Sequence, residues 1–162
     1  MLEFGIVHSN AQYRKSVGAI IINPRTKKIL VLDWKIYAIY GIVQGGQEEN
    51  EDEITALERE IIEESGYTDF TIKEKLGENI ISYFYVPTKQ VWRKLELACY
   101  IVLLNSEEHA EQKLEKNESF EIKWIDANEY LEQINNHTST ESHNFQGLGE
   151  FVKRALQTHY LE

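Results

Sequence analysis

The chain has 162 residues, of which 42% are hydrophobic and 27% are charged, a length and composition that predict one globular domain spanning residues 1–162 with a sizeable core. Its formal net charge of −10 disfavours an extended nucleic acid as a partner, because such binding depends on a basic surface. No apolar run approaches the ~20 residues of a membrane span, the N-terminus lacks a secretory signal pattern, and Cys99 is the single cysteine, so we expect a cytoplasmic protein with no membrane partner.

Three strands are predicted ahead of the first helix. Segments 17–22 and 29–32 are rich in β-branched and apolar residues, and segment 23–28 between them has turn-forming residues, so these strands form a hairpin. A third strand is expected over residues 37–43, and it leads into a loop at Gly45.

Residues 52–64 contain neither glycine nor proline and are mostly good helix formers, which predicts a helix. Glu60, Glu63 and Glu64 share one face of it, because positions three and four apart are neighbours on a helical surface. Like charges at this spacing repel, and a hard divalent cation with oxygen ligands would neutralise them. The alternative interpretation is a solvated acidic surface, the usual role of a charged helix face.

The residues around these glutamates predict a loop, a helix and a stop. Gly45 and Gly46 permit a tight loop whose backbone oxygens approach an ion or a phosphate closely. Gly66 has the residue type expected just after a helix C-terminus. An apolar stripe with helical spacing predicts the side that packs on the core: Ile54, Leu57 and Ile61.

After the helix, segments 70–72, 80–86 and 95–104 have the composition of strands, with a turn over 87–90. The last strand is long and apolar, so we expect it near the centre of the sheet, with Cys99 as a buried small side chain.

Candidate substrate contacts lie on and near these strands. Tyr83 and Tyr85 alternate with Phe84 and share one strand face, where they serve either core packing or the stacking of a nucleobase. Three basic side chains are either solvated or in contact with a phosphate: Arg14, Arg93 and Lys94.

The last third of the chain completes the predicted sandwich. Segment 106–116 is expected to be a loop or short helix, 121–125 a strand, 127–134 a helix and 135–144 a polar turn. A terminal helix follows from apolar residues at helical spacing: Phe145, Leu148, Phe151, Val152, Ala155 and Leu156.

The sequence around the first helix reads glycine, five residues, glutamate, seven residues, then Arg-Glu-Ile-Ile-Glu-Glu-Ser-Gly-Tyr. This pattern resembles the signature of the Nudix hydrolases, the family that includes the MutT-like pyrophosphohydrolases. The matching residues are Gly45, Glu51, Arg59, Glu60, Ile61, Glu63, Glu64 and Gly66, whereas Tyr67 is aromatic where an aliphatic residue is usual. The resemblance implies the Nudix fold, an α/β/α sandwich with a mixed central sheet.

The resemblance also implies a metal-dependent hydrolase of phosphoanhydride bonds. Glu60, Glu63 and Glu64, with the carbonyl of Gly45, would hold Mg²⁺ or Mn²⁺ and polarise the phosphates of a substrate. A structural ion pair would orient these glutamates, as it does in the family: Glu51 with Arg59.

The catalytic residues implied are Glu60, Glu64 and Glu118, and Glu60 and Glu118 are the two candidates for the general base. Glu118 stands six residues before Trp124, a placement similar to the loop glutamate of several Nudix members. Its alternative role is that of an exposed loop acid.

For the substrate, the run Val-Gln-Gly-Gly at 43–46 is similar to the Pro-Gln-Gly-Gly of the branch that cleaves dinucleoside polyphosphates and trims RNA 5′ ends. Tyr83 and Tyr85 lie where members of that branch often have a tyrosine. The resemblance therefore favours a small nucleotide such as diadenosine tetraphosphate. An RNA 5′ end, ADP-ribose, nucleotide sugars and nucleoside triphosphates stay open as alternatives.

Two other functional classes exist among similar domains. A nucleotide-sensing module without turnover usually has a damaged glutamate set, and the set here is complete. An isoprenoid diphosphate isomerase recruits a reactive cysteine, whereas Cys99 lies inside a predicted core strand. The sequence leaves the oligomeric state open between a monomer and a homodimer.

Overall fold

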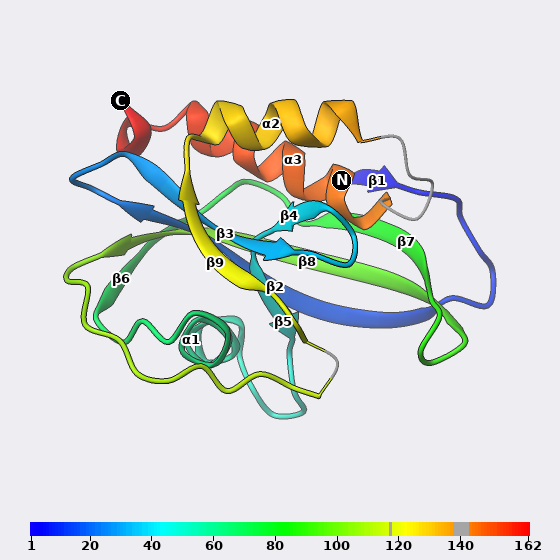
Figure 1. The fold of residues 1–162 in the computed structure, drawn as a ribbon. Helices are drawn as coiled ribbons and strands as arrows, with labels where there is room; N and C mark the ends of the chain where they lie inside the picture. Colours follow the sequence, from blue (N-terminus) through cyan, green and yellow to red (C-terminus); the bar gives the residue numbers. More distant parts are fainter. Residues whose placement is uncertain (117, 138–142) are drawn as a thin grey trace.

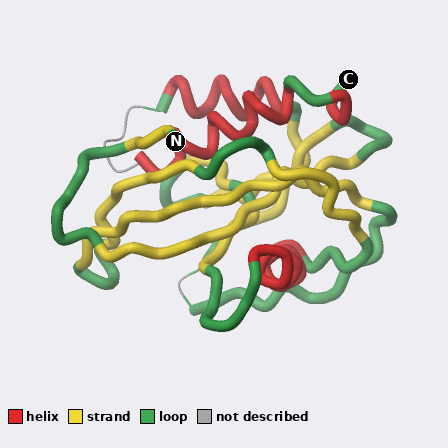
Figure 2. Tube along the Cα trace, turned by 180° about the vertical axis from the view of Figure 1, so that it is seen from behind, coloured by secondary structure: helices red, strands yellow, loops and turns green. Residues whose placement is uncertain are grey.

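A mixed β-sheet runs through the molecule, with helix α1 (Glu53–Ser65) on one face and helices α2 (Ala127–Asn136) and α3 (His143–Leu156) on the other (Figure 1). This computed structural model describes residues 1–116, 118–137 and 143–162, and of residues 143–146 it describes the backbone only. The view from behind shows the same three layers (Figure 2). The predicted α/β/α sandwich is therefore confirmed.

Nine strands form the sheet in the described part of the chain, and six of them follow the order β1-β7-β8-β2-β3-β4. Of the others, β5 pairs with β2, β6 with β8, and β9 with β3. Their bounds are β1 Leu2–Phe4, β2 Gln12–Asn23, β3 Lys28–Trp34, β4 Ile39–Gly41, β5 Val43–Gly46, β6 Phe70–Lys75, β7 Ile80–Val86, β8 Val91–Leu104 and β9 Glu121–Ile125.

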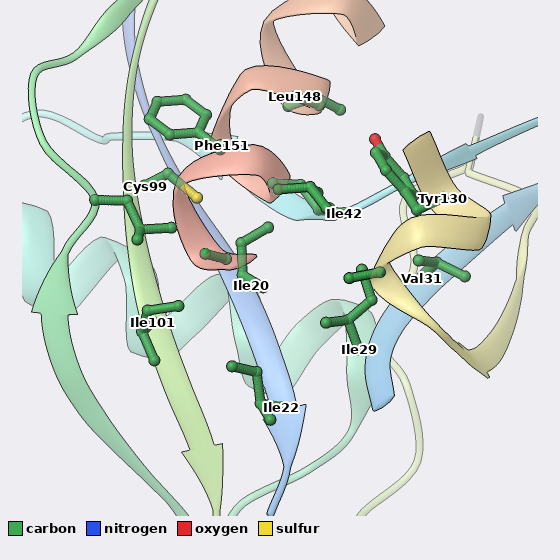
Figure 3. Packing of buried hydrophobic residues seen from close by; sticks show 14 of the residues in the cluster. Ile20, Ile22, Ile29, Val31, Ile42, Cys99, Ile101, Tyr130, Leu148 and Phe151 are labelled. Carbon is green, nitrogen blue, oxygen red and sulfur yellow. The ribbon is translucent and has the colours of Figure 1, made fainter. Parts of the chain in front are cut away.

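The centre of the sheet is the parallel pair β2 and β8, in register from Gln12 beside Arg93 to Ile22 beside Leu103. Because side chains alternate along a strand, the buried residues of β2 divide between two cores. Ile20 and Ile22 pack toward α2 and α3, as Figure 3 shows, and Ile21 packs toward α1. Both faces of the sheet are thus apolar, which explains the long hydrophobic runs in the sequence.

The strand predicted over 37–43 is wrong in extent, because the chain divides there into two short strands with different partners. Strand β4 pairs with β3, and β5 pairs with β2. Between them Ile42 joins the core under α2 and α3, while Val43 joins the core under α1. Strand β1, which pairs with β7 at the edge of the sheet, was not predicted.

Helix α1 begins and ends where capping chemistry requires. Asp52 is its N-cap and accepts a hydrogen bond from the Thr55 N–H at 2.7 Å, and Gly66 ends it with φ of 77°. Leu57 and Ile61 are buried as predicted, but Ile54 is 41% exposed. The core side of α1 is therefore narrower than the apolar stripe indicated, and Ala56 completes it.

The remaining elements agree with prediction apart from their ends. Segment 106–116 is a loop that runs along α1 (Figure 1), and a short 3-10 helix over His159–Leu161 follows α3. The polar turn predicted over 135–144 falls partly on residues 138–142, which lie outside the described residues. The side chain of Phe145 lies outside them too. In the part of the chain that the structure describes, no helix combines the length and apolar character that a membrane crossing requires.

Candidate active site

Strand β5 and helix α1 together position two carboxylates. The Gln44 N–H donates to Glu64 Oε1 at 2.8 Å, and Glu64 is only 3% exposed. The Glu60 carboxylate lies directly on Gly45, where an added Cβ would stand 1.9 Å from the carboxyl carbon. Glycine at position 45 thus leaves the space that the Glu60 carboxylate fills.

Arg59 connects the acids around this point. Its guanidinium makes a bidentate pair with Glu51, with Nε 2.8 Å from Oε1 and Nη2 2.9 Å from Oε2. Its Nη1 lies 2.6 Å from Glu60 Oε1 and 3.5 Å from Glu63 Oε2, and its Nη2 donates to the Gly46 carbonyl at 3.0 Å. The predicted ion pair between Glu51 and Arg59 is formed, and Arg59 also contacts Glu60 and Glu63.

This pair makes a testable contribution to stability. Hydrogen bonds from Arg59 lower the pKa of Glu51 to about 2, so the carboxylate stabilises the fold above the unfolded-state pKa of about 4.3, and that stabilisation is lost as pH falls toward 2. We expect Glu51→Gln to lower the melting temperature at pH 7, and the difference from wild type to shrink between pH 5 and pH 2. Thermal denaturation across that range checks this, and a difference that does not vary with pH would contradict it.

Glu60 and Glu64 lie in a cluster that has an excess of negative charge. Burial raises the pKa of Glu64 well above its ordinary value, and the carboxylates of Glu118 and Glu60 raise it further. Burial also raises the pKa of Glu60; Arg59 opposes this shift, and Glu63 and Glu118 add to it. The positive charge of Arg59 therefore does not balance the cluster, and an added cation would favour the ionised carboxylates.

The donor set fits a hard divalent cation by its chemistry. Carboxylates and a backbone carbonyl are the oxygen ligands that Mg²⁺ and Mn²⁺ prefer, and the Glu60 carboxylate already lies against the Gly45 backbone. Across residues 1–116, 118–137 and 143–162, however, no three acid, histidine or cysteine side chains are gathered as a metal site. Arg59 instead contacts Glu60 and Glu63.

Glu118 comes to this cluster from the loop ahead of β9. Its carboxylate is near enough to Glu64 to raise the pKa of that buried carboxyl. A turn fixes its position, since the Glu115 N–H donates to Glu118 Oε1 at 2.7 Å and the Glu118 N–H donates to the Glu115 carbonyl at 2.9 Å. The structure therefore brings together Glu60, Glu64 and Glu118, which the sequence analysis grouped as catalytic.

A cleft of about 230 Å³ adjoins the glycines of β5. Arg14 lies directly under Gly46, where an added Cβ would stand 2.0 Å from its Nη2 atom. Neither Arg14 nor Arg93 forms an ion pair with a carboxylate in the described part of the chain. The lining residues are Arg14, Ser16, Gln44, Gly45, Gly46, Phe84, Val86, Lys89, Arg93 and Leu95. A hollow of about 350 Å³ lies at the other end of β2 and holds the Arg25–Glu107 ion pair, away from these acids.

The predicted substrate contacts divide between two faces of the sheet. In the β7–β8 register Phe84 pairs with Arg93, whereas Tyr83 pairs with Lys94, and adjacent pairs point to opposite faces. Phe84 and Arg93 line the cleft. Tyr83 is 5% exposed and has the Lys94 Nζ 5.7 Å from its ring centroid on the other face.

Tyr85 shares that other face and packs against Trp92, with ring centroids 5.7 Å apart. The structure thus does not bring Tyr83, Tyr85 and Lys94 into the cleft. The aromatic residue that lines the cleft is Phe84, which was not among the predicted contacts. Strand alternation separates it from the tyrosines, but only the pairing with β8 shows which set faces the cleft.

A family model for the NUDIX domain matches residues 12–145. The chain belongs to the Nudix family. The match covers every element from β2 to α2, including the signature helix, so the family resemblance seen in the sequence is confirmed. No relative among curated proteins matches the sequence.

Several solved structures share the Nudix fold at low identity. An Ap4A hydrolase from C. elegans, in a binary complex, is 17% identical, with a TM-score of 0.59 over 89% of this chain and 96% of that one. A MutT protein from Methanosarcina mazei is 16% identical, with a TM-score of 0.57 over 93% and 100% of the two chains. A NUDIX hydrolase from Nitrosomonas europaea is 17% identical, with a TM-score of 0.57 over 86% and 90%.

The structural similarity to these proteins shows a common fold. Membership of the Nudix family assigns the chain to hydrolases that act on phosphoanhydride bonds. The Nudix isomerase alternative requires a reactive cysteine. Cys99 is 1% exposed, and burial raises the pKa of its thiol to about 12, so it has the properties of a core side chain and not of a nucleophile.

Proposed function

We propose that this Nudix domain is a divalent-metal-dependent pyrophosphohydrolase that cleaves a phosphoanhydride bond in a nucleoside diphosphate-linked substrate. The observation that supports this most is the junction at Gly45 and Gly46. On the face of β5 that is turned to α1, Glu60 lies against the Gly45 backbone, and on the opposite face of the strand Arg14 lies against Gly46. A phosphate chain crossing these two glycines would meet acids that suit a metal at one end and guanidinium groups at the other.

The metal would be held by Glu60, Glu63, Glu64 and the carbonyl of Gly45. When bound, Mg²⁺ or Mn²⁺ supplies charge neutralisation on the bridging phosphates and a more acidic water. Because phosphoryl transfer needs positioning and electrostatic stabilisation more than covalent chemistry, the protein's task is to hold these oxygens in place. Arg59 contacts the Glu60 and Glu63 carboxylates directly, and Glu51 holds its guanidinium in place.

Glu118 and Glu60 are the proposed proton acceptors for the attacking water. Glu118 lies beside the buried Glu64 and is held by its own turn, so its carboxylate is oriented before a substrate arrives. Glu60 is already paired with Arg59, which makes it the weaker candidate for the base.

For the substrate we propose a dinucleoside polyphosphate such as diadenosine tetraphosphate. The cleft combines three cationic side chains with the ring of Phe84, and this suits several phosphates followed by a stacked nucleobase: Arg14, Lys89 and Arg93 are the cations. Its volume of about 230 Å³ is smaller than the roughly 300–1,000 Å³ of a drug-sized site, so it would hold one end of such a molecule. We propose a cytoplasmic location for this reaction.

A substrate panel tests the proposal. The purified protein is incubated with diadenosine tetraphosphate, ADP-ribose, a nucleotide sugar, a nucleoside triphosphate and a triphosphorylated RNA 5′ end, each with Mg²⁺ or Mn²⁺, and products are separated by chromatography. We expect metal-dependent cleavage of diadenosine tetraphosphate. If only ADP-ribose is split, the substrate assignment is wrong and the reaction class stands; no cleavage of any compound would contradict both.

The cleft itself makes a second prediction. We expect Arg14→Ala and Arg93→Ala each to raise KM for diadenosine tetraphosphate about 10-fold to 100-fold, because a charged hydrogen bond contributes about 1.5–3 kcal/mol. The kcat value should change less, since these side chains lie away from the acids. Arg25→Ala, which removes an arginine paired with Glu107 at the far end of β2, is the control and should leave KM unchanged. Equal KM values in all three variants would show that the substrate binds elsewhere.

A further inference from the structure

The loop between β8 and β9 is attached to the last turn of α1 at successive backbone groups. The Lys113 N–H donates to the Glu63 carbonyl at 2.8 Å, and the Ala110 N–H donates to the Gly66 carbonyl at 2.7 Å. Between these two bonds the Gln112 side chain donates from Nε2 to the Glu64 carbonyl at 2.6 Å. We call the stretch from Ala110 to Lys113 the strap.

The strap satisfies carbonyls that a helix end leaves without an intrahelical partner. Helix α1 has no basic residue in its last turn to contact them. The carbonyls involved belong to Glu63 and Glu64, whose side chains are proposed metal ligands. The strap is therefore bonded to the backbone of two residues of the acidic site.

Gly66 also allows the strap to approach the end of α1 closely. A Cβ at Gly66 would stand 2.3 Å from the Ala110 carbonyl oxygen, so only glycine allows the strap to lie this close to the helix. Gly66 also has a φ of 77°, which glycine adopts without strain. Beyond this point the rings of Tyr67 and His109 pack with centroids 5.8 Å apart.

We propose that Gln112 is a positioning residue for hydrolysis, which holds the loop so that Glu118 stands beside Glu64. This inference rests on the proposed function of the glutamate site. Gln112 supplies the one side-chain bond of the strap, and Glu118 follows it by six residues in a turn closed on Glu115. Gln112 does not line the cleft, and its side chain bonds to the backbone carbonyl of Glu64 and not to a carboxylate, so we propose that it acts on the reaction through the placement of Glu118.

The test is a double-mutant cycle between Gln112 and Glu118. Gln112→Met keeps the length of the side chain and removes its hydrogen-bond donor. We expect it to lower kcat about 10-fold in the wild-type background, as supporting residues around catalytic groups commonly do, with KM unchanged. In the Glu118→Gln background it should lower kcat no further, because the carboxylate it places is already gone. Glu111→Gln, an exposed neighbour in the same loop, is the control and should match wild type.

Two outcomes of the cycle would overturn the inference. An equal loss of kcat in both backgrounds would mean that Gln112 acts independently of Glu118, through the backbone of Glu64 or through general stability. No loss in the wild-type background would mean that it positions nothing. Melting temperatures of all four proteins separate a folding defect from a loss of rate.

Amide hydrogen exchange gives a second readout that needs neither metal nor turnover. In Gln112→Met we expect the Lys113 amide to lose protection while amides in the middle of α1 keep theirs. Retained protection at Lys113 would overturn the inference even if the enzyme is active. If Gln112→Met shows this exchange pattern but the wild-type protein splits no substrate, the proposed function is refuted while the role of Gln112 in holding the strap stands.

Discussion

Glu63→Gln is expected to lower metal-dependent turnover by at least about 100-fold, because losing a charged ligand removes several kcal/mol of transition-state stabilisation and each 1.4 kcal/mol is about tenfold in rate. The Glu63 side chain is 38% exposed and its contact with Arg59 is long at 3.5 Å, so its loss should leave the fold intact. Steady-state kinetics with Mg²⁺ and a melting curve measure the two effects separately.

Glu58→Gln provides a matched control for this prediction. It makes the same chemical change on the same helix, at an exposed position away from the proposed ligands. We expect wild-type rates from it. If Glu63→Gln is as active as Glu58→Gln, Glu63 is not a metal ligand. The proposed catalytic role of this face of α1 would then be wrong.

Gly45→Ala is the second variant with a large expected effect. The new Cβ would occupy the place of the Glu60 carboxylate, whose carbon is 1.9 Å from that point. Since the displaced group is the end of a flexible side chain, we expect a stability change of less than about 1 kcal/mol, within the range of modest substitutions. Activity, in contrast, should fall at least about 10-fold, because a ligand displaced by an ångström loses its orientation.

The control here is Gly149→Ala in α3, where an added Cβ would meet Ile134 at an ordinary distance of 3.5 Å. It should keep full activity and lose no stability. If Gly45→Ala also keeps full activity, the contact between Glu60 and the β5 backbone has no part in the reaction. Melting temperatures and kcat values for both variants decide the matter.

The sequence predicted best what depends on local spacing. The helix at 53–65 and the shared face of Glu60 and Glu64 follow from helical periodicity, and the glycine stop at Gly66 follows from backbone preference. The proximity of Glu118 to Glu64 required the family resemblance, since the loop that carries it is held by long-range hydrogen bonds.

What the sequence did not predict depends on pairing between distant strands. Alternation shows that Tyr83 and Phe84 point to opposite faces, but which of them faces the cleft is decided by the register of β7 on β8. Likewise the break at Ile42 reflects a change of partner from β3 to β2, which no local pattern encodes. The contact of Gln112 with the Glu64 carbonyl spans 48 positions and has no sequence signal at all.

The place of Arg59 has a consequence for how a cation would enter. Its guanidinium is already a counterion for Glu60 and Glu63, so binding of Mg²⁺ would replace one counterion with another. The affinity for the metal is then reduced by the interaction that Arg59 gives up. The protein would also stay folded when depleted of metal and regain activity once the ion is restored.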